Sequence, residues 1–395
     1  MAFTVTRPLL IIFLTIFVNL VGFGIIIPLL PFYAESFGAS PLVIGLLFAV
    51  FSLCQLASAP ALGDLSDQYG RRPVLIFSLL GTVVSFAMLA LAHSVAMLFA
   101  ARIVDGLSGG NISTARAYVA DVTEPKDRAR AYGLIGAAFG LGFILGPALS
   151  GLLAGISYTA PIWAAAAVTL VATLMAWLWL PETVHRARAG VGNPFRFLPG
   201  LLQRPIVRRV LAMDFVYWFA FAMFQTTFAL FAARRFGFDA ARTGYFFAAF
   251  GVIGAIIQGG FIRPIVARIG DKPTFRLGLG FGAAGLVAAA AAHSVPAFAV
   301  ALVPLAFGIG FGHPTISSLV SRVARGDEQG RVNGAASAVE SLGRTIGPVW
   351  GNASLQQYGE ATPYISAAAF LLLAFLLSVG LSVGDADSVS PIANT

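Results

Sequence analysis

Ionisable residues are rare in this chain, and a few of them stand in the middle of long apolar runs. Arg102 and Asp105 are three residues apart, and Glu340 and Arg344 are four apart, so each pair can share one face of a helix. A charge in an apolar interior is costly, so a retained charge is a functional candidate by default. A carboxylate can carry a proton there, because desolvation favours its protonated form and a neighbouring arginine opposes it. The alternative is a structural ion pair that locks helices together.

The elements that must position these charges follow from the composition. The 395 residues are 58% hydrophobic and 11% charged, with a mean hydropathy of +0.86, and no soluble domain of this size hides so much apolar surface. An apolar run of about 18 residues or more spans a bilayer as a helix. We therefore predict an all-α membrane protein with twelve transmembrane helices, at 8–31, 42–62, 74–92, 95–120, 131–156, 160–180, 207–232, 243–262, 274–292, 295–320, 332–357 and 363–383.

Lysine and arginine are distributed unevenly along these runs and their connections. If both termini lie on one side of the membrane, the segments on that side hold most of the 25 Lys and Arg residues. The opposite side receives three arginines, Arg234, Arg235 and Arg242, all in one connection. This positive-inside bias predicts a multi-pass protein of the bacterial inner (cytoplasmic) membrane with both termini in the cytoplasm.

Several classes of function are excluded by what the sequence lacks. The net charge of +8 follows the membrane topology and does not indicate a nucleic-acid partner. There is no phosphate-binding loop of the form G-x-x-x-x-G-K-[ST], so ATP is not the energy source. The four histidines and the single Cys54 match no zinc site. We therefore expect no cofactor, no metal and no enzymatic activity, and an ion gradient as the energy source.

The two halves of the chain repeat each other. Gly70-Arg-Arg-Pro73 recurs 200 residues later as Gly270-Asp-Lys-Pro273, and Gly146-Pro147 recurs 201 residues later as Gly347-Pro348. Matches at one offset indicate the duplication of a six-helix unit. The predicted organisation is an N-terminal six-helix bundle at 1–180, a cytoplasmic linker at 181–206, a C-terminal six-helix bundle at 207–384 and a cytoplasmic tail at 385–395.

Three further polar residues lie inside apolar runs, and each has two interpretations. Asp214 lines a cavity or lies near the membrane interface, and Asn19 faces a cavity or makes a helix–helix hydrogen bond. His313 is a packed neutral histidine or a proton-linked group. The predicted proton-coupling residues are Asp105, Glu340 and Asp214.

The seventh run is rich in aromatic residues. It contains Tyr217, Trp218 and Phe221, with the polar Gln225 one turn later. Aromatic faces with a few polar groups suit a bulky amphipathic ligand, whereas lipid-facing aromatic residues are the alternative. The predicted substrate-binding residues are Asn19, Arg102, Tyr217, Trp218, Phe221, Gln225, Arg344 and His313.

A short charged segment, Gly63–Pro73, joins the second and third runs and has the form G-x-L-x-D-x-x-G-R-R-P. Its glycines allow tight turning. This segment closely resembles the signature loop of the major facilitator superfamily of transporters. The resemblance implies that the two bundles are related by a pseudo-two-fold axis along the membrane normal, with the ligand near the midplane. It also implies a charged gate on the cytoplasmic side, made of Gly63, Asp67, Gly70, Arg71, Arg72 and Asp121.

The fifth run carries regularly spaced glycines and a proline. The spacing resembles the antiporter motif of drug–proton exporters, with Ser150 in place of one glycine. Small residues let two helices approach closely and a proline bends a helix, so a general packing face is the alternative. The residues of the motif are Gly133, Gly142, Gly146, Pro147 and Gly151.

Over the whole chain the resemblance is nearest to the tetracycline efflux pumps, in the twelve-helix branch of drug–proton antiporters. Those pumps place acidic residues in spans one, three and nine, where this chain has Asn19, Ser85 and the neutral stretch Leu277–Ala292. The resemblance therefore implies the fold, the gate and the direction of export, without tetracycline as the substrate.

Together these features predict a secondary active exporter, a proton-coupled antiporter of small amphipathic compounds such as drugs. It would work by alternating access, as a monomer surrounded by membrane lipids. A cavity holding Arg102, Asp105, Glu340 and Arg344 favours neutral, zwitterionic or singly charged amphiphiles over a dication. The alternative is a lipid or glycolipid flippase on the same fold.

Overall fold

The structure of the chain is a computed structural model that describes residues 6–109, 111–124, 127–183, 198–324 and 328–381. These residues are almost entirely helical and include no β-strand. The first half forms α1 (Arg7–Glu35), α2 (Pro41–Tyr69), α3 (Arg71–Ala90), α4 (Val95–Ser108), α5 (Asn111–Val122), α6 (Arg128–Ala154) and α7 (Thr159–Trp179). The second half forms α8 (Leu198–Leu202), α9 (Pro205–Phe236), α10 (Ala240–Ile256), a π-helical turn (Ile257–Phe261), α11 (Ile262–Ile269), α12 (Asp271–Ala291), α13 (Val295–Val323), α14 (Gln329–Tyr358) and α15 (Thr362–Ser378).

Within the described residues, nine helices are long and apolar enough to cross a membrane, with α10, the π-helical turn and α11 forming one of them. Three further crossings complete the set. α4 and α5 form one crossing with a break at Gly109, α14 is a long helix with many polar residues, and α15 is a mainly apolar helix of 17 residues. The prediction of an all-α membrane protein with twelve transmembrane helices is confirmed.

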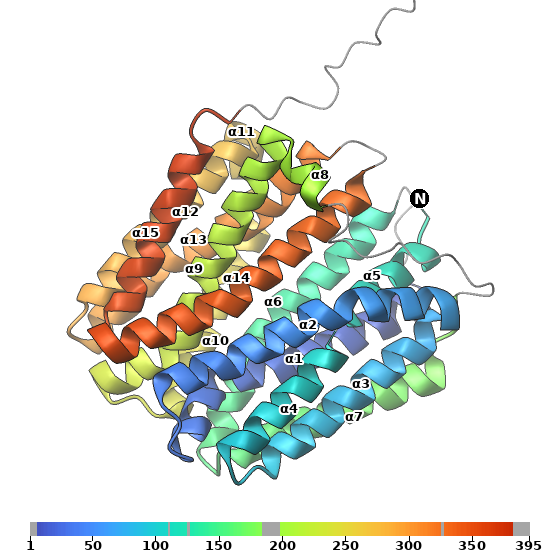
Figure 1. The fold of residues 1–395 in the computed structure, drawn as a ribbon, viewed down its shortest axis with the longest axis horizontal. Coiled ribbons are helices and arrows are strands. Elements are labelled where there is room, and N and C mark those ends of the chain that lie inside the picture. The colour runs from blue at the N-terminus through green and yellow to red at the C-terminus, as the bar shows by residue number, and fades with distance from the viewer. Residues whose placement is uncertain (1–5, 110, 125–126, 184–197, 325–327, 382–395) are drawn as a thin grey trace, which may run out of the picture.

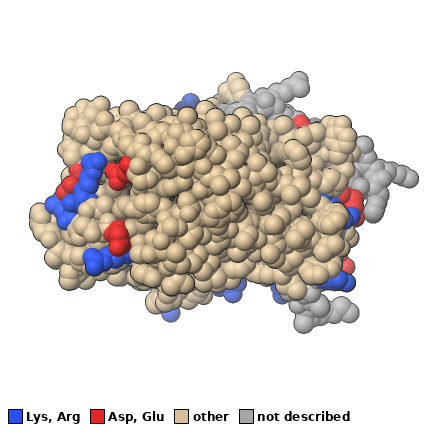
Figure 2. Space-filling view, turned by 90° about the horizontal axis from the view of Figure 1, so that it is seen from below, with Lys and Arg blue, Asp and Glu red and all other residues tan. Residues whose placement is uncertain are grey.

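Figure 1 shows the two halves as neighbouring groups of helices, α1 to α7 at the lower right and α9 to α15 at the upper left. We call the end of the molecule where α1 begins and α15 ends the terminal face, and the opposite end the distal face. Figure 2 shows charged side chains gathered mainly toward the two ends, with a broad uncharged surface between them. That uncharged surface matches the hydrocarbon core of a bilayer.

Side-chain caps fix where several helices begin at the distal face. The Ser40 side chain accepts a hydrogen bond from the backbone nitrogen of Val43 at the start of α2. The Asp239 side chain accepts one from the backbone nitrogen of Arg242 at the start of α10. Ser94 and Ser294 cap α4 and α13 in the same way. These caps occupy related positions in the two halves, so the repeat includes the helix start signals as well as the apolar runs.

The glycines of the predicted antiporter motif pack α6 against α1 in its own half and α10 in the other. A Cβ placed on Gly142 would lie 2.7 Å from the Cβ of Leu20, and one on Gly146 would lie 2.7 Å from the Cα of Gly24, so only glycine allows α1 to approach so closely. Gly151 faces α10 across the two halves. Gly133 faces open space instead, so it takes no part in this packing.

The two halves touch closely near the distal face. A Cβ placed on Gly244 of α10 would lie 2.5 Å from the backbone nitrogen of Gly151. On the other side of the molecule, the backbone nitrogen of Leu42 in α2 donates to Oε1 of Gln356 in α14, at 3.1 Å. The backbones of α6 and α10, and those of α2 and α14, are therefore in contact in this region.

Toward the terminal face the same helices leave room between them. A Cβ placed on Gly133, Gly136 or Gly140 of α6 would meet no atom within 4 Å, although these glycines continue the helical stripe that contains Gly151. Gly254 of α10 also faces open space. α6 and α10 therefore diverge from the distal face toward the terminal face.

The charged segment at Gly63–Pro73 is not the extended turn that its glycines suggest. α2 continues to Tyr69 and α3 begins at Arg71, so the connection consists of Gly70 alone, with φ +107°. Gly63 lies inside α2, where the Ser66 hydroxyl donates to its carbonyl, so Gly63 does not act as a turn residue. The helix continues because no residue between the two glycines requires left-handed backbone.

The predicted linker is only partly covered by the structure. Residues 184–197 lie outside the described residues, but 198–202 form the short helix α8, and α9 begins at Pro205, inside the predicted linker. The predicted tail at 385–395 also lies outside the described residues. The boundaries of the two bundles, the linker and the tail remain predictions.

Candidate functional site

Arg102 and Asp105 form a direct ion pair inside the first half. Nη1 of Arg102 lies 2.9 Å from Oδ2 of Asp105, and the two side chains are 1% and 7% exposed. The guanidinium lies 4.1 Å from the ring centre of Phe51, and its Nε donates to the carbonyl of Leu47, both on α2. The pair therefore ties α4 to α2.

The sequence-based assignment of Arg102 to the substrate site does not fit this geometry. Its contacts come from α2 and α4, and the residue is 1% exposed, so the side chain offers no surface to a ligand. A charge this deeply buried is kept by its partner Asp105 rather than by solvent. The geometry favours the structural interpretation of this pair.

A second group of charges lies in the other half. Asp214 on α9 is 1% exposed, and the charges of Glu340 and Arg344 on α14 act on it. Glu340 and Arg344 are themselves half-buried on α14. α9 and α14 pack closely here at a glycine. A Cβ on Gly343 would lie only 2.9 Å from the backbone nitrogen of Phe219. We call Asp214, Glu340 and Arg344 the α9–α14 charge cluster.

Within the described residues, Arg344 makes no direct ion pair with a carboxylate. Its Nη2 donates to the Ser341 hydroxyl at 3.3 Å, and its buried Nε has no partner. Oδ2 of Asp214 is buried and also without a hydrogen-bond partner. Nη2 of Arg102 is also buried without a partner, so the unpaired atoms alone do not separate the two groups of charges. What distinguishes this cluster is that its arginine is not closed onto one carboxylate, whereas Arg102 is bonded to Asp105 at 2.9 Å.

Trp218 carries the aromatic side of this cluster. Its ring centre lies 5.6 Å from that of Phe221 and 5.2 Å from that of His313 on α13, both at steep angles. The guanidinium carbon of Arg344 lies 5.5 Å from the Trp218 ring centre. The indole nitrogen is buried without a partner. The predicted residues Trp218, Phe221, His313 and Arg344 are thus brought together.

The remaining predicted residues occupy different environments. Tyr217 is buried next to the cluster, where its ring fills the space beside Gly312 and its hydroxyl approaches the His313 backbone without a well-aligned hydrogen bond. Gln225 is half-buried further along α9, and Asn19 is half-buried on α1. The cluster is therefore centred on the second half, whereas the sequence divided the site between the two halves.

Sequence reasoning missed one charged residue of the site, Arg116 on α5. Its side chain is exposed, and its charge acts on both His313 and Glu340 across the two halves. Arg116 lies inside the predicted fourth span, at 95–120, and an arginine there was a usable signal. With Arg116, the site has two positive and two negative charges.

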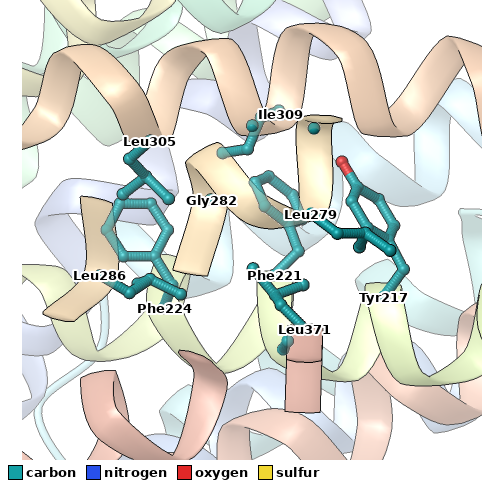
Figure 3. Close-up of a pocket in the computed structure, with 12 residues that line it drawn as sticks. Tyr217, Phe221, Phe224, Leu279, Gly282, Leu286, Leu305, Ile309 and Leu371 are labelled. Atoms are coloured by element: carbon teal, nitrogen blue, oxygen red, sulfur yellow. The ribbon is translucent and has the colours of Figure 1, made fainter. Parts of the chain in front are cut away.

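A small apolar pocket lies behind the aromatic residues. Figure 3 shows Tyr217, Phe221 and Phe224 on α9, with Leu305 and Ile309 on the facing helix α13. The pocket has a volume of about 20 Å³, which is room for about one water molecule. It is too small for a substrate, so the residues that line it act as apolar packing behind the aromatic face.

The predicted gate residues meet at the terminal face of the first half. Nη2 of Arg71 lies 2.5 Å from Oδ1 of Asp67, and Nε of Arg71 lies 3.3 Å from Oδ2 of Asp121. Nη1 of Arg71 donates to the Ser66 hydroxyl at 2.5 Å. Arg72 does not join the acids, and its Nη2 donates to the carbonyl of Trp177 instead.

Glu182, which was not predicted, caps the first turn of α3. Its carboxylate accepts hydrogen bonds from the backbone nitrogens of Arg71 at 2.9 Å and Arg72 at 3.1 Å. A Cβ at position 70 would lie 2.4 Å from this carboxylate, which together with the positive φ explains why Gly70 is glycine. Thr183 donates to Asp121 at 3.3 Å. The segment that follows α7 is thus joined to the gate residues Arg71 and Asp121.

The second half carries the corresponding ion pair with the charges exchanged. Asp271 and Arg322 lie 2.9 Å apart, and their repeat equivalents in the first half are Arg71 and Asp121. The sequence contained this signal, because an offset of 200 or 201 residues relates both pairs. A match of residue identities hides this relation, because each of the two positions carries the opposite charge in the other half.

Neutralising the first-half cluster is expected to slow transport more than neutralising its counterpart. Asp121→Asn should lower the rate about tenfold, because the side chain of Arg71 is 8% exposed and loses a carboxylate partner. Asp271→Asn should cost less than about twofold, because the side chain of Arg322 is 51% exposed and stays solvated. Transport rates per folded protein in vesicles measure both. Equal rates in the two variants would contradict a gating role for the first cluster.

Comparison with known proteins places the chain in a family. The family model for the Major Facilitator Superfamily matches residues 12–348 and 259–391. The chain belongs to the Major Facilitator Superfamily. The sequence-based recognition of this superfamily, with its resemblance to tetracycline efflux proteins, is confirmed.

Individual superfamily relatives are similar over most of their length. The class C tetracycline resistance protein of Escherichia coli is 34% identical over 354 residues, which cover 87% of this chain and 88% of that protein. Major facilitator superfamily domain-containing protein 10 of Bos taurus is 30% identical over 438 residues, covering 95% and 93%. The crystal structure of the human organic anion transporter MFSD10 has a TM-score of 0.73 at 26% identity, covering 94% of this chain and 99% of that one.

Proposed function

We propose that this chain is a secondary active exporter that exchanges protons for small amphipathic compounds by alternating access. The superfamily match and the tetracycline resistance relative support a transporter of the drug efflux type. The α9–α14 charge cluster carries the proposal, because it combines ionisable groups, unpaired polar atoms and aromatic rings in one buried place. Such a combination serves binding better than packing.

Proton coupling is assigned to Asp214 and Glu340 rather than to Asp105. Asp105 is held by the direct contact with Arg102, whereas Arg344 lies near two carboxylates and is bonded to neither. A substrate or proton can therefore change which carboxylate Arg344 neutralises. This exchange links the protonation of one acid to occupancy of the site, which an antiporter requires.

The substrate is assigned by charge and shape. Arg116 and Arg344 face Asp214 and Glu340, so the site is neutral overall and is suited to zwitterionic or singly charged amphiphiles. Trp218 supplies a flat apolar surface for a ring system. The relatives agree with this class, since one is a tetracycline resistance protein and another an organic anion transporter. Neither of these activities is that of a lipid flippase, so the flippase alternative is not proposed.

The arrangement of the two halves supports alternating access. The close contacts lie near the distal face, and α6 and α10 diverge toward the terminal face. The positive-inside bias assigns the terminal face to the cytoplasm. The structure then corresponds to a state open to the cytoplasm, in which an exporter would collect its substrate.

The function is tested with purified protein in proteoliposomes. An imposed pH gradient should drive accumulation of a labelled zwitterionic amphiphile such as a fluoroquinolone, and dissipating the gradient should stop it. The matched control is Glu360→Gln, which removes a carboxylate from a partly exposed ion pair with Arg235 at the distal face. Transport that is independent of the pH gradient in the wild-type protein would contradict proton coupling.

A bulky residue at Gly244 is expected to prevent closure of the distal face. Gly244→Leu would collide with the backbone of Gly151, whereas Gly254→Leu enters open space and serves as the control. Spin labels at the exposed residues Leu46 and Gln357 report the distance between α2 and α14 near that face. The distance should increase for Gly244→Leu and stay at the wild-type value for Gly254→Leu. An unchanged distance in both would show that this contact does not seal the protein.

A further inference from the structure

Three cations are gathered at the terminal face of the second half, where α15 ends. Nε of Arg209 donates to the carbonyl of Leu377 at 2.5 Å, and the ammonium of Lys272 donates to that of Leu381. Nη2 of Arg276 donates to the carbonyl of Ser378 at 2.6 Å. Within the described residues, none of the three forms an ion pair with a carboxylate, and the charges of Arg209 and Arg276 both act on Lys272.

This accumulation of charge is not balanced locally. The carbonyls at the end of α15 carry only partial negative charge, so they hold the cations in place without neutralising them. The nearest acid in sequence is Asp271, whose Oδ2 is already engaged by Arg322 at 2.9 Å and by the Ser318 hydroxyl at 2.9 Å. Like charges at close range repel each other, so an external anion would stabilise the group.

The repeat shows which kind of group is missing. In the first half, the carboxylate of Glu182 binds the first two backbone nitrogens of α3. The equivalent positions in the second half, 382 and 383, are serine and valine. The positions equivalent to Glu182 and Thr183 therefore supply no carboxylate to α12, whose own first residue, Asp271, is paired with Arg322. Within the described residues, Lys272, Arg209 and Arg276 are thus left without the anion that Glu182 provides in the first half.

A groove opens next to Lys272 and gives the missing anion a place to bind. It has a volume of about 460 Å³ and runs between the start of α12, the end of α13 and the end of α15. Its walls are mixed, since Lys272 and the ion pair of Asp271 and Arg322 stand beside the apolar side chains of Pro273, Leu319 and Leu381. Of the three cations, Lys272 lines the groove, and it is the one cation of that lining without a carboxylate partner among the described residues. Free phosphate would use only the cations, whereas a phospholipid would also use the apolar walls.

The level of the groove in the membrane fits the same ligand. Arg209 lies in the first turns of α9, Lys272 in the first turn of α12, and Leu381 just after α15, so all three lie where membrane-spanning helices end. Phospholipid head groups occupy this level, and anionic lipids attract clustered lysine and arginine there.

We propose that Arg209, Lys272 and Arg276, with the adjoining groove, form a binding site for the phosphate head group of an anionic phospholipid. The lipid phosphate takes the part in the second half that the Glu182 carboxylate takes in the first. The site depends on the membrane fold and not on the proposed substrate, so it can be tested in protein that does not transport.

Binding is measured by native mass spectrometry on the purified full-length protein with phosphatidylglycerol, phosphatidylcholine and inorganic phosphate. Phosphatidylglycerol should bind at least tenfold more tightly than phosphatidylcholine. Lys272→Gln should weaken its binding about fivefold, and Lys272→Arg should retain it. The control Arg268→Gln removes an exposed cation from the same face, on α11, and should leave the affinity unchanged.

A second variant tests the proposal even if Lys272→Gln loses stability. Pro273→Glu places a second carboxylate in the first turn of α12, beside Asp271, where it favours the helix and competes with the lipid phosphate for Lys272. It should lower phosphatidylglycerol affinity at least fivefold in a protein with wild-type thermal stability. Unchanged affinity would overturn the proposal. Equal losses for Arg268→Gln and Lys272→Gln, or displacement of the lipid by inorganic phosphate, would also overturn it.

The chain's own tail contains two acids, Asp385 and Asp387, that could compete for the site. A variant with both changed to asparagine should bind phosphatidylglycerol with wild-type affinity. An affinity that rises fivefold or more in this variant would show that the tail, and not a lipid, is the natural occupant, and the proposal would fail.

Discussion

Proton-driven transport should fall about tenfold or more in Asp214→Asn, while the protein remains folded. Asp214 is 1% exposed, its Oδ2 has no hydrogen-bond partner, and the charges of Glu340 and Arg344 act on it. Asparagine keeps the shape and removes the exchangeable proton, so the coupling step is lost while substrate contact with Trp218 remains. The measurement is accumulation in proteoliposomes with and without an imposed pH gradient.

Exchange without net proton flow separates coupling from binding. Counterflow of labelled for unlabelled substrate at equal pH on both sides should persist in Asp214→Asn within about twofold of wild type. Glu340→Gln should behave in the same way if the two acids act together, because each changes the charge that Arg344 has to balance. Normal gradient-driven accumulation by Asp214→Asn would remove this residue from the mechanism and leave Glu340 as the coupling acid.

Asp105→Asn is expected to destabilise the protein by about 3–5 kcal/mol, because it leaves the buried charge of Arg102 without a partner. The side chain of Arg102 is 1% exposed, so solvent cannot replace the carboxylate. The expected result is a lower midpoint of thermal unfolding in detergent and a smaller yield of folded protein. This outcome differs from that of Asp214→Asn, in which stability is retained and coupling is lost.

A double variant distinguishes a structural pair from a coupling residue. Arg102→Met combined with Asp105→Leu removes both charges and should recover most of the stability lost in Asp105→Asn, since neither side chain is left as a buried unpaired ion. If the double variant also transports in response to a pH gradient, Asp105 has no part in coupling. Full stability of Asp105→Asn alone, with loss of the pH response, would reverse the assignment and make Asp105 the coupling acid.

The sequence located both sets of charges in apolar runs but could not show which of them forms a closed ion pair. Arg102 with Asp105 and Glu340 with Arg344 look alike as spacings on a helix, yet only the first pair closes, at 2.9 Å. Arg344 instead donates to Ser341 and lies next to Trp218 and Asp214 from another helix. Which neighbour a long side chain selects depends on the helices packed against it, and these come from distant parts of the sequence.

The internal repeat relates ion pairs as well as helices. The offset of 200 or 201 residues predicted two related halves, and it also relates the ion pair of Arg71 and Asp121 to that of Asp271 and Arg322. Chain duplication preserves the positions that meet in space, while either position can take either charge. A comparison of residue identities alone therefore loses an ion pair whose charges have been exchanged.

The sequence by itself determined the membrane class, the twelve crossings and the superfamily, because long apolar runs leave the backbone no option in lipid other than the helix. It also located the charged segment Gly63–Pro73, whose Asp67 and Arg71 meet in an ion pair that Asp121 of α5 joins. Only the tertiary structure showed that Asp214, Arg344 and Trp218 come together where α9 and α14 pack, that the charge of Arg116 acts there from the other half, and that Arg102 is paired elsewhere. The physical reason is that a helix fixes which residues share a face, whereas burial and partner choice depend on how the faces of different helices pack together.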